Sequence, residues 1–288
     1  MDYAKIVVDD PRPLVRRITL NRPEKRNPLS NELRGELFDA LEAADQDPEV
    51  RVTVIRGAGT CFSSGYDLAS NVSKGQPYYT AGGLGNWPRH VVEGFFHIWD
   101  LAKPVIAQVH GYCLAGGTEL ATACDLVYVA DDAKIGYPVV RSISPPDNQF
   151  YPWIVGLRRA MELMLTGDHM SGIEAAACGF ANRSFPEAEL EGRVLDIAER
   201  VAKTPSDLQQ INKRAVHRQM DAMGIRAAIR AGTELQQLAT FTETTRAHLA
   251  ELAGNLTDAL SKRDRSYGDY RTGRDGPAPA DGTPPRDE

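Results

Sequence analysis

The sequence is poor in cysteine and lacks any long apolar run, and both shortages narrow the class of protein. Its four cysteines lie far apart, with no Cys-x-x-Cys pair and no histidine at metal-ligand spacing. We therefore expect reduced, mostly buried thiols, with neither a disulfide framework nor a metal site. No run of about 18 apolar residues is present, so no segment is expected to span a membrane. Residues 1–5 lack the basic-then-apolar order of a secretory signal, and the cytoplasm is the expected compartment.

Positive charge is also in short supply. Lysine and arginine total 33 against 39 aspartates and glutamates, a formal net charge of −6, which argues against nucleic acid as the main partner. A local cluster of Arg and Lys can still bind the phosphates of a small ligand. The apolar fraction of 42% and the charged fraction of 25% are ordinary for a globular protein. A chain of 288 residues suffices for one large α/β domain or two small ones.

The first 140 residues alternate between strand-like and helix-like segments. The β-favouring runs are residues 14–20, 50–55, 105–109 and 125–130. After the first of them, Ser30 has the features of a helix N-cap. Leu33, Leu37 and Leu41 then mark one buried helical stripe. This order predicts parallel strands joined by right-handed crossovers.

Two other regions depart from this alternation. Residues 70–90 are rich in Gly, Tyr, Asn and Pro and are expected to form a long surface loop. After Pro152 the patterning becomes helical. The expected helices are residues 157–165, 172–177, 187–202, 206–220 and 225–252. We expect an α/β core over residues 1–200, a helical region over 201–276 and a disordered tail over 277–288.

One candidate functional segment is Cys61–Leu68, which follows a predicted strand. Its small residues, including Ser63, Ser64 and Gly65, let the backbone approach a ligand and expose N–H groups. Taken alone, the segment is more typical of an ordinary strand-to-loop turn.

A second candidate is His110–Leu120, which follows a strand and opens a helix-like segment. The Gly116-Gly117 pair lies in the first turn, where unpaired N–H donors and the positive end of the helix dipole suit a developing oxyanion. Glu119 lies three residues into this helix, where an acidic residue is also favoured by the dipole alone. A third candidate segment is Ile135–Arg141, followed by the Pro-rich loop that holds Asp147. Such an aspartate is most often a turn or N-cap residue.

Together, these segments resemble the crotonase (enoyl-CoA hydratase/isomerase) superfamily from about Leu14 to about Tyr270. The stretch Thr19–Ser30 resembles that family's first signature, and Arg158–Asp168 and Glu174-Ala175 resemble its helical landmarks. The resemblance implies an α/β fold: a spiral of ββα units with two near-perpendicular sheets and a C-terminal helical trimerisation region. It also implies homotrimers or hexamers, an acyl-CoA thioester as substrate, and no separate cofactor.

The resemblance also assigns roles to individual residues. The backbone N–H groups of Tyr66 and Gly116 correspond to the family's oxyanion hole, which favours the enolate of the thioester. The expected substrate- and CoA-binding residues are Arg26, Ser64, Asp67, Leu68, Tyr137 and Val139. For Arg26, a solvated surface position is an equal alternative. Trp87 and Arg89 are candidates to cover a larger or polar acyl group.

The sequence departs from the family at the second catalytic glutamate. The hydratases use two glutamates, of which the first matches Glu119, whereas the second position holds Val139, which cannot transfer a proton. Glu119 could act alone, as in double-bond isomerisation, because losing one acid–base group weakens a reaction without removing oxyanion stabilisation. Asp147 could instead supply the second function, since it matches the nucleophilic aspartate of the family's aryl-CoA dehalogenases. Those enzymes, however, lack a glutamate at the position of Glu119.

Three hypotheses from different classes therefore remain. The first is an acyl-CoA lyase or isomerase with Glu119 as acid/base. The second is an acyl- or aryl-CoA hydrolase or dehalogenase with Asp147 as nucleophile. The third is a non-catalytic acyl-CoA-binding protein.

Overall fold

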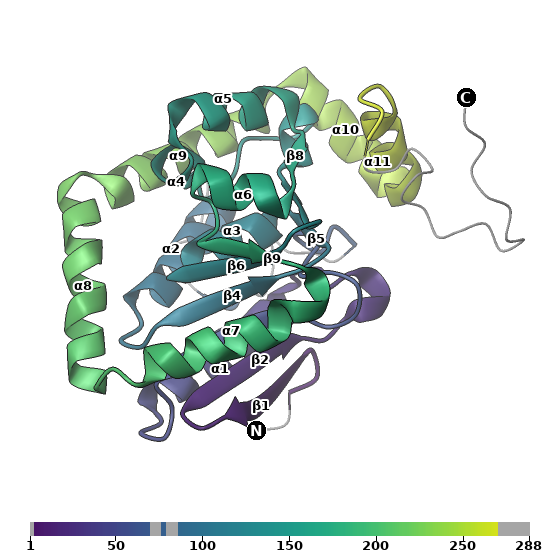
Figure 1. The fold of residues 1–288 in the computed structure, drawn as a ribbon. Coiled ribbons are helices and arrows are strands. Elements are labelled where there is room, and N and C mark those ends of the chain that lie inside the picture. The colour runs from purple at the N-terminus through teal and green to yellow at the C-terminus, as the bar shows by residue number, and fades with distance from the viewer. Residues whose placement is uncertain (1–2, 70–75, 79–85, 270–288) are drawn as a thin grey trace, which may run out of the picture.

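The computed structural model describes residues 3–69, 76–78 and 86–269, which form two sheets surrounded by helices (Figure 1). The six-stranded sheet has the order β1-β2-β3-β4-β6-β9, and the three-stranded sheet has the order β5-β7-β8. The strands are β1 Ile6–Arg12, β2 Val15–Leu20, β3 Val52–Gly57, β4 Val105–Val109, β5 Tyr112–Leu114, β6 Leu126–Ala130, β7 Lys134–Gly136, β8 His169–Met170 and β9 Arg183–Phe185. The predicted α/β architecture is confirmed.

Parallel pairing dominates the large sheet, as the alternating pattern predicts. Strands β2, β3, β4, β6 and β9 pair in parallel, and only the β1–β2 hairpin is antiparallel. Every residue of β4 is buried, as expected for a strand covered on both faces. The first strand, β1, was not anticipated, because its Asp and Pro residues hide the β pattern.

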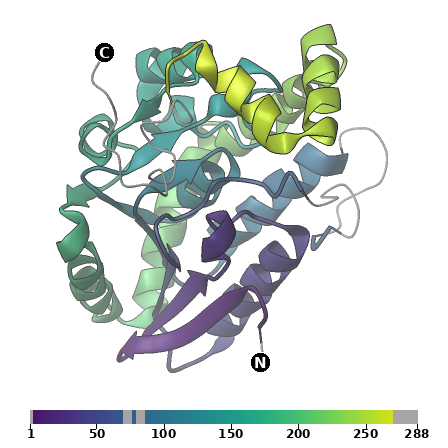
Figure 2. The same ribbon diagram turned by 90° about the vertical axis from the view of Figure 1, so that its right-hand side faces the viewer.

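The helices cover the sheet and extend beyond it. They are α1 Asn31–Gln46, α2 Asn86–Asp100, α3 Gly116–Ala123, α4 Tyr151–Ile154, α5 Gly156–Thr166, α6 Gly172–Cys178, α7 Glu187–Ala202, α8 Ser206–Ala222, α9 Ile225–Ala239, α10 Glu243–Gly254 and α11 Leu256–Arg265, with short 3-10 turns η1 Pro23–Lys25 and η2 Pro138–Arg141. The strands at the N-terminus and the helices at the C-terminus lie at opposite ends of the molecule (Figure 2). Within the described ranges, no helix is long and apolar enough to cross a membrane.

Two sequence expectations need correction. The single helix over residues 225–252 is wrong, because Thr242 caps a new helix, α10, by accepting a hydrogen bond from the Thr245 N–H. The expected loop over residues 70–90 is wrong at its end, because α2 begins at Asn86 and buries an apolar face. Residues 70–75 and 79–85 of that loop, and the tail 277–288, lie outside the described residues. The division at residue 200 stays a prediction.

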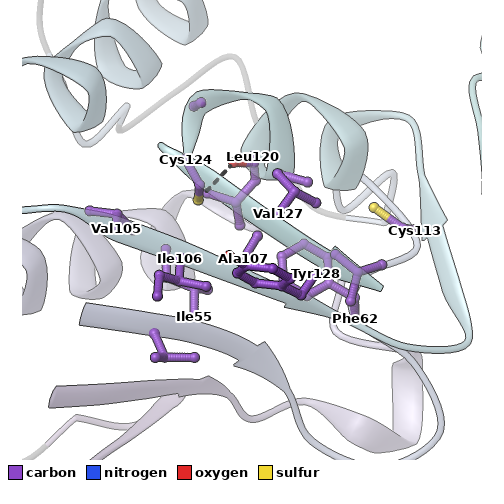
Figure 3. Packing of buried hydrophobic residues seen from close by; sticks show 14 of the residues in the cluster. Ile55, Phe62, Val105, Ile106, Ala107, Cys113, Leu120, Cys124, Val127 and Tyr128 are labelled. Carbon is purple, nitrogen blue, oxygen red and sulfur yellow. Dashed lines mark hydrogen bonds between the residues drawn. The ribbon is translucent and has the colours of Figure 1, made fainter. Parts of the chain in front are cut away.

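The core lies between the large sheet and its helices. Ile55, Ala107 and Val127 lie in register on three adjacent strands, in the same buried cluster as Leu120 and Cys124 at the end of α3 (Figure 3). Helix α1 contributes the expected stripe of Leu33, Leu37 and Leu41, and Ser30 accepts the N-cap hydrogen bond from the Leu33 N–H at 3.2 Å. The base of α3 is therefore held rigidly on the sheet.

The segment after β3 and the segment that opens α3 are in close backbone contact at Gly111. Gly111 has φ +55°, and a Cβ at this position would lie 2.0 Å from the Thr60 carbonyl oxygen. The Phe62 N–H donates to the His110 carbonyl at 2.8 Å, and the Leu114 N–H donates to the Ser63 carbonyl at 3.0 Å. This close backbone contact aligns the segment after β3 with the segment that opens α3.

We expect Gly111→Ala to destabilise the fold by at least about 2 kcal/mol, because a left-handed residue and a backbone clash combine at this position. The matched control is Gly192→Ala within α7, where an added Cβ meets nothing within 4 Å. That change should stabilise by about 0.5–1 kcal/mol. Urea unfolding of both variants and of the wild type measures the free energy of unfolding. Equal stabilities of the two variants would show that the backbone contact at Gly111 is not important for the fold.

Candidate active site

Glu119 projects from the first turn of α3 and is 1% exposed. The residue before this helix, Ala115, has φ 49° and ψ −123°, a conformation that alanine rarely adopts. The Ala115 N–H donates to the Gly136 carbonyl at 3.0 Å, which ties the start of α3 to the end of β7. The backbone strain is thus held by the second sheet, directly beside the buried carboxylate.

Four donors converge on the Glu119 carboxylate. The Tyr66 hydroxyl donates to Oε2, and the Tyr137 hydroxyl donates to Oε1 at 3.0 Å. The backbone N–H groups of Asp147 and Asn148 also donate to Oε1, at 2.9 and 3.5 Å. Burial raises the pKa of Glu119, and all four hydrogen bonds oppose that rise. Both tyrosines remain protonated donors, because burial holds the pKa of each phenol well above its usual value.

The backbone N–H groups of Tyr66 and Gly116 come from the two aligned loops. Neither donates a hydrogen bond within the described part of the chain. A Cβ on Gly65 would lie 3.3 Å from the Gly116 nitrogen, so the loops are in backbone contact here. The Tyr66 ring covers the Cα of Gly116, where a Cβ would lie 2.8 Å from ring atoms. Position 116 therefore requires glycine.

Asp147 is the second carboxyl group of this site and is 3% exposed. The Trp87 indole hydrogen-bonds to its carboxyl, whereas Oδ1 has no hydrogen-bond partner among the described residues. Burial raises the pKa of Asp147 well above its usual value, and the nearby Glu119 raises it further. The pKa of each carboxyl is raised, so we treat the two groups as a pair that holds one proton. Because Glu119 accepts four hydrogen bonds and Asp147 fewer, we assign this proton to Asp147 and the negative charge to Glu119.

A buried arginine completes the charged groups of the site. Arg34 on α1 is 1% exposed, and its guanidinium lies 5.7 Å from the Tyr66 ring centroid and 5.0 Å from that of Trp87. It donates to Asn31 Oδ1 at 2.5 Å, and its other terminal nitrogen lies 3.1 Å from His90 Nε2. Sequence reasoning missed Arg34. The signal was available, since Arg34 lies one helical turn before the buried Phe38.

Other expected site residues lie at the loop entrance. The Ser64 N–H donates to the Arg26 carbonyl at 2.9 Å, and the Arg26 guanidinium lies 5.5 Å from the Tyr112 ring centroid. Arg26 is exposed and Leu68 is 49% exposed. Asp67 is buried and paired with Arg22 at 2.7 Å. The structure thus brings Arg26 and Ser64 together, and it engages Asp67 in an internal ion pair.

The segment that carries Val139 contacts the site through a different residue. Val139 is half-buried in η2, whereas Tyr137, two residues earlier, reaches Glu119. Arg141 is fully committed elsewhere, with its guanidinium on Asp168 at 2.9 Å and on Asp269 at 2.7 Å. Across the described residues, no group of three or more His, Cys, Asp or Glu is arranged to hold a metal ion.

Comparison with known proteins identifies the family. The sequence model of the enoyl-CoA hydratase/isomerase family matches residues 13–255. EchA13 of Mycobacterium tuberculosis, provisionally named as an enoyl-CoA hydratase, is 35% identical over 266 residues, which cover 86% of this chain and 81% of that protein. The chain belongs to the enoyl-CoA hydratase/isomerase family, within the crotonase superfamily.

Solved structures agree with this assignment. An enoyl-CoA hydratase from Mycobacterium smegmatis has a TM-score of 0.84 at 30% identity, with 93% of this chain and 96% of that chain covered. An enoyl-CoA hydratase/isomerase from Xanthobacter autotrophicus Py2 has a TM-score of 0.83 at 33% identity, with 92% and 99% covered. The resemblance inferred from the sequence motifs is confirmed, and so is the α/β fold with two sheets, whereas the trimerisation role of the C-terminal helices stays a prediction.

The carboxyl pair predicts an unusual dependence of stability on pH. A folded-state pKa raised above the unfolded value gives stability at low pH that is lost as pH rises from about 4, by about 1.4 kcal/mol per unit for one proton. Asp147→Asn removes this titration. We therefore expect it to flatten the loss of unfolding free energy above pH 4 and to stabilise the protein at pH 7 by at least about 1 kcal/mol.

Urea unfolding between pH 5 and pH 8, at one protein concentration, measures this effect. The control is Asp132→Asn on an exposed turn, which should leave the wild-type slope unchanged. If the unfolding free energy of Asp147→Asn fell with pH as steeply as that of the wild type, Asp147 would not be the group that binds a proton in the folded state.

Proposed function

We propose that this protein forms a thioester enolate from an acyl-CoA, with Glu119 as the acid/base and the N–H groups of Tyr66 and Gly116 as the oxyanion hole. The observation that carries the proposal is a buried, hydrogen-bonded carboxylate near two backbone N–H groups that have no partner among the described residues. Membership of the enoyl-CoA hydratase/isomerase family supports an acyl-CoA substrate.

The proposed chemistry follows from where charge develops. Glu119 removes a proton from the carbon next to the thioester carbonyl, and the carbonyl oxygen becomes an enolate. The two N–H groups and the positive end of α3 favour that oxygen over the neutral carbonyl. Each donor of this type is worth about 3–4 kcal/mol of barrier lowering. Glu119 then returns the proton, either to the same carbon or to another carbon of the acyl chain.

Asp147 is the best candidate for a second proton-transfer group in place of Val139. Its carboxyl is buried near that of Glu119, and both the burial and the negative charge of Glu119 favour its neutral form. A neutral carboxyl can donate a proton, whereas a nucleophile must be ionised. The electrostatics therefore favour an acid role for Asp147 over the nucleophilic role of the dehalogenase hypothesis.

The loop entrance is proposed to bind the CoA moiety. Arg26 is exposed beside Ser64, so its guanidinium is accessible to a phosphate group. Asp67 contributes through its ion pair with Arg22, which holds the loop in place, and the exposed Leu68 offers an apolar contact to pantetheine. Tyr137 and Val139 are proposed to border the acyl group. No separate cofactor is required for this chemistry.

We expect Glu119→Gln to reduce turnover by about 10²–10⁴-fold while changing the Kd for a CoA ester by less than about threefold. The assay uses crotonyl-CoA, longer 2-enoyl-CoAs and 3-enoyl-CoAs, followed by the enoyl thioester absorbance and by mass spectrometry of the products. Glu162→Gln on the exposed face of α5 serves as the matched control.

Different outcomes separate the hypotheses. Undiminished turnover in Glu119→Gln would contradict the proposed role of Glu119 as the acid/base. A covalent adduct on Asp147 after trapping with aryl-CoA substrates would support the nucleophile hypothesis instead. Tight binding of CoA esters without any product from the panel would support a non-catalytic binding protein.

The C-terminal helices are proposed to mediate a homotrimer or a dimer of trimers. Leu235 and Leu238 on α9 and Phe241, two residues beyond its end, are 62%, 59% and 52% exposed. Leu208 and Ile211 form a similar exposed apolar pair on α8. Apolar surface of this kind marks an interaction site.

We expect the double change Leu235→Glu and Leu238→Glu to convert the assembly into monomers, because it buries charge in the proposed interface. Light scattering coupled to size-exclusion chromatography gives the mass. Val7→Glu on the exposed side of β1 is the control and should keep the wild-type mass. A monomeric wild-type protein, or an unchanged mass of the double variant, would contradict this interface.

A further inference from the structure

Arg34 carries a buried charge that the proposed chemistry does not use directly. Its side chain belongs to α1, a helix that otherwise buries apolar residues against the sheet. No carboxylate lies within ion-pair distance of it among the described residues. Burying a guanidinium in this way costs several kcal/mol, and folds retain such a cost mainly at functional sites.

The neutral neighbours of Arg34 are arranged to keep its charge available. The Tyr78 carbonyl can only accept, so His90 donates to it through Nδ1 and leaves Nε2 to accept from Arg34. Burial lowers the pKa of His90 to about 4, so its ring is neutral. Burial also lowers the pKa of Arg34, but a guanidinium stays protonated in proteins. Asn31, the remaining partner, is also uncharged.

The aromatic contacts of Arg34 connect it with both carboxyl groups. Its guanidinium lies over the Tyr66 and Trp87 rings, which meet edge to face with centroids 5.1 Å apart. The polar end of Tyr66 donates to Glu119, and the polar end of Trp87 hydrogen-bonds to Asp147. One side chain on α1 therefore contacts the two donors that orient the two carboxyls.

We propose that Arg34 is a positioning residue of this site. It braces Tyr66 and Trp87 against the carboxyl pair, and its positive charge keeps one carboxyl of the pair ionised. This role rests on the proposed function, in which Glu119 is the acid/base, and it adds an electrostatic contribution from Arg34 during the reaction. When Glu119 takes the substrate proton and the negative charge moves to the enolate, the guanidinium charge remains nearby to balance it.

Three variants separate the two parts of this role. Arg34→Lys keeps the charge but loses the planar group that stacks on the rings. Arg34→Met and Arg34→Gln lose both, and the polar glutamine provides a neutral variant if methionine is not tolerated. Arg159→Met on α5 is the control, because its guanidinium pairs with Glu162 and Glu174 away from the site. Circular dichroism confirms that each protein is folded.

The first readout needs no substrate. Infrared titration follows the protonated carboxyl signal of the pair, identified by its loss in Asp147→Asn and Glu119→Gln. The titratable groups that face Arg34 are Glu119, Asp147, Tyr66 and His90. Above pH 5 His90 is neutral and the Tyr66 phenol stays protonated, so only the two carboxyls titrate between pH 5 and pH 8. Loss of the positive charge should move the titration of the pair upward by about one pH unit or more. Arg34→Lys should shift it much less.

The second readout is the pH dependence of kcat/KM. In Arg34→Met and Arg34→Gln, the rise of kcat/KM on the acid side of the profile should shift to higher pH together with the infrared titration of the carboxyl pair. In Arg34→Lys, kcat/KM should be lower, while the pH at which it rises should be nearly unchanged. An unshifted titration in both neutral variants would overturn the proposal. If turnover proves independent of Glu119, the proposed function fails, and the infrared titration still decides the role of Arg34.

Discussion

The burial of the Glu119 carboxylate is the constraint on which the geometry of the site depends. A carboxylate at this depth is tolerable only when hydrogen bonds replace its hydration. Its four donors come from three segments outside α3: Tyr66 after β3, Tyr137 after β7, and the backbone at Asp147 and Asn148. The convergence of these segments on α3 is therefore tied to a single side chain.

Backbone conformations that ordinary residues avoid make this convergence possible. Ala115 opens α3 with a positive φ, and Arg26 and Asn27 are consecutive left-handed residues at the loop entrance. The buried Asn27 amide donates to the Ala58 and Cys61 carbonyls at 2.8 and 2.9 Å, which holds the entrance loop against the segment after β3. Each strained residue is fixed by hydrogen bonds to a neighbouring loop, so the strain supports a rigid site.

Local patterns in the sequence predicted what depends on local chemistry. The Ser30 cap, the leucine stripe of α1, the parallel strands and the glycine pair that opens α3 all follow from turn, cap and periodicity rules. Contacts between distant segments were beyond those rules. Helix α2 was hidden by its loop-like composition, and its Trp87 meets Asp147 across 60 positions. The role of Arg34 likewise depends on rings that only the folded chain brings together.

The valine at position 139 need not leave the site with a single ionisable group. Tyr137, two residues before Val139, supplies a donor to Glu119. A second carboxyl enters instead from Asp147, whose own backbone N–H is already one of the donors to Glu119. Any shift of this loop therefore moves a donor and an acid together. Because loops carry these groups while the sheet holds α3 in place, the proposed second acid can come from a different loop while the proposed oxyanion hole keeps its geometry.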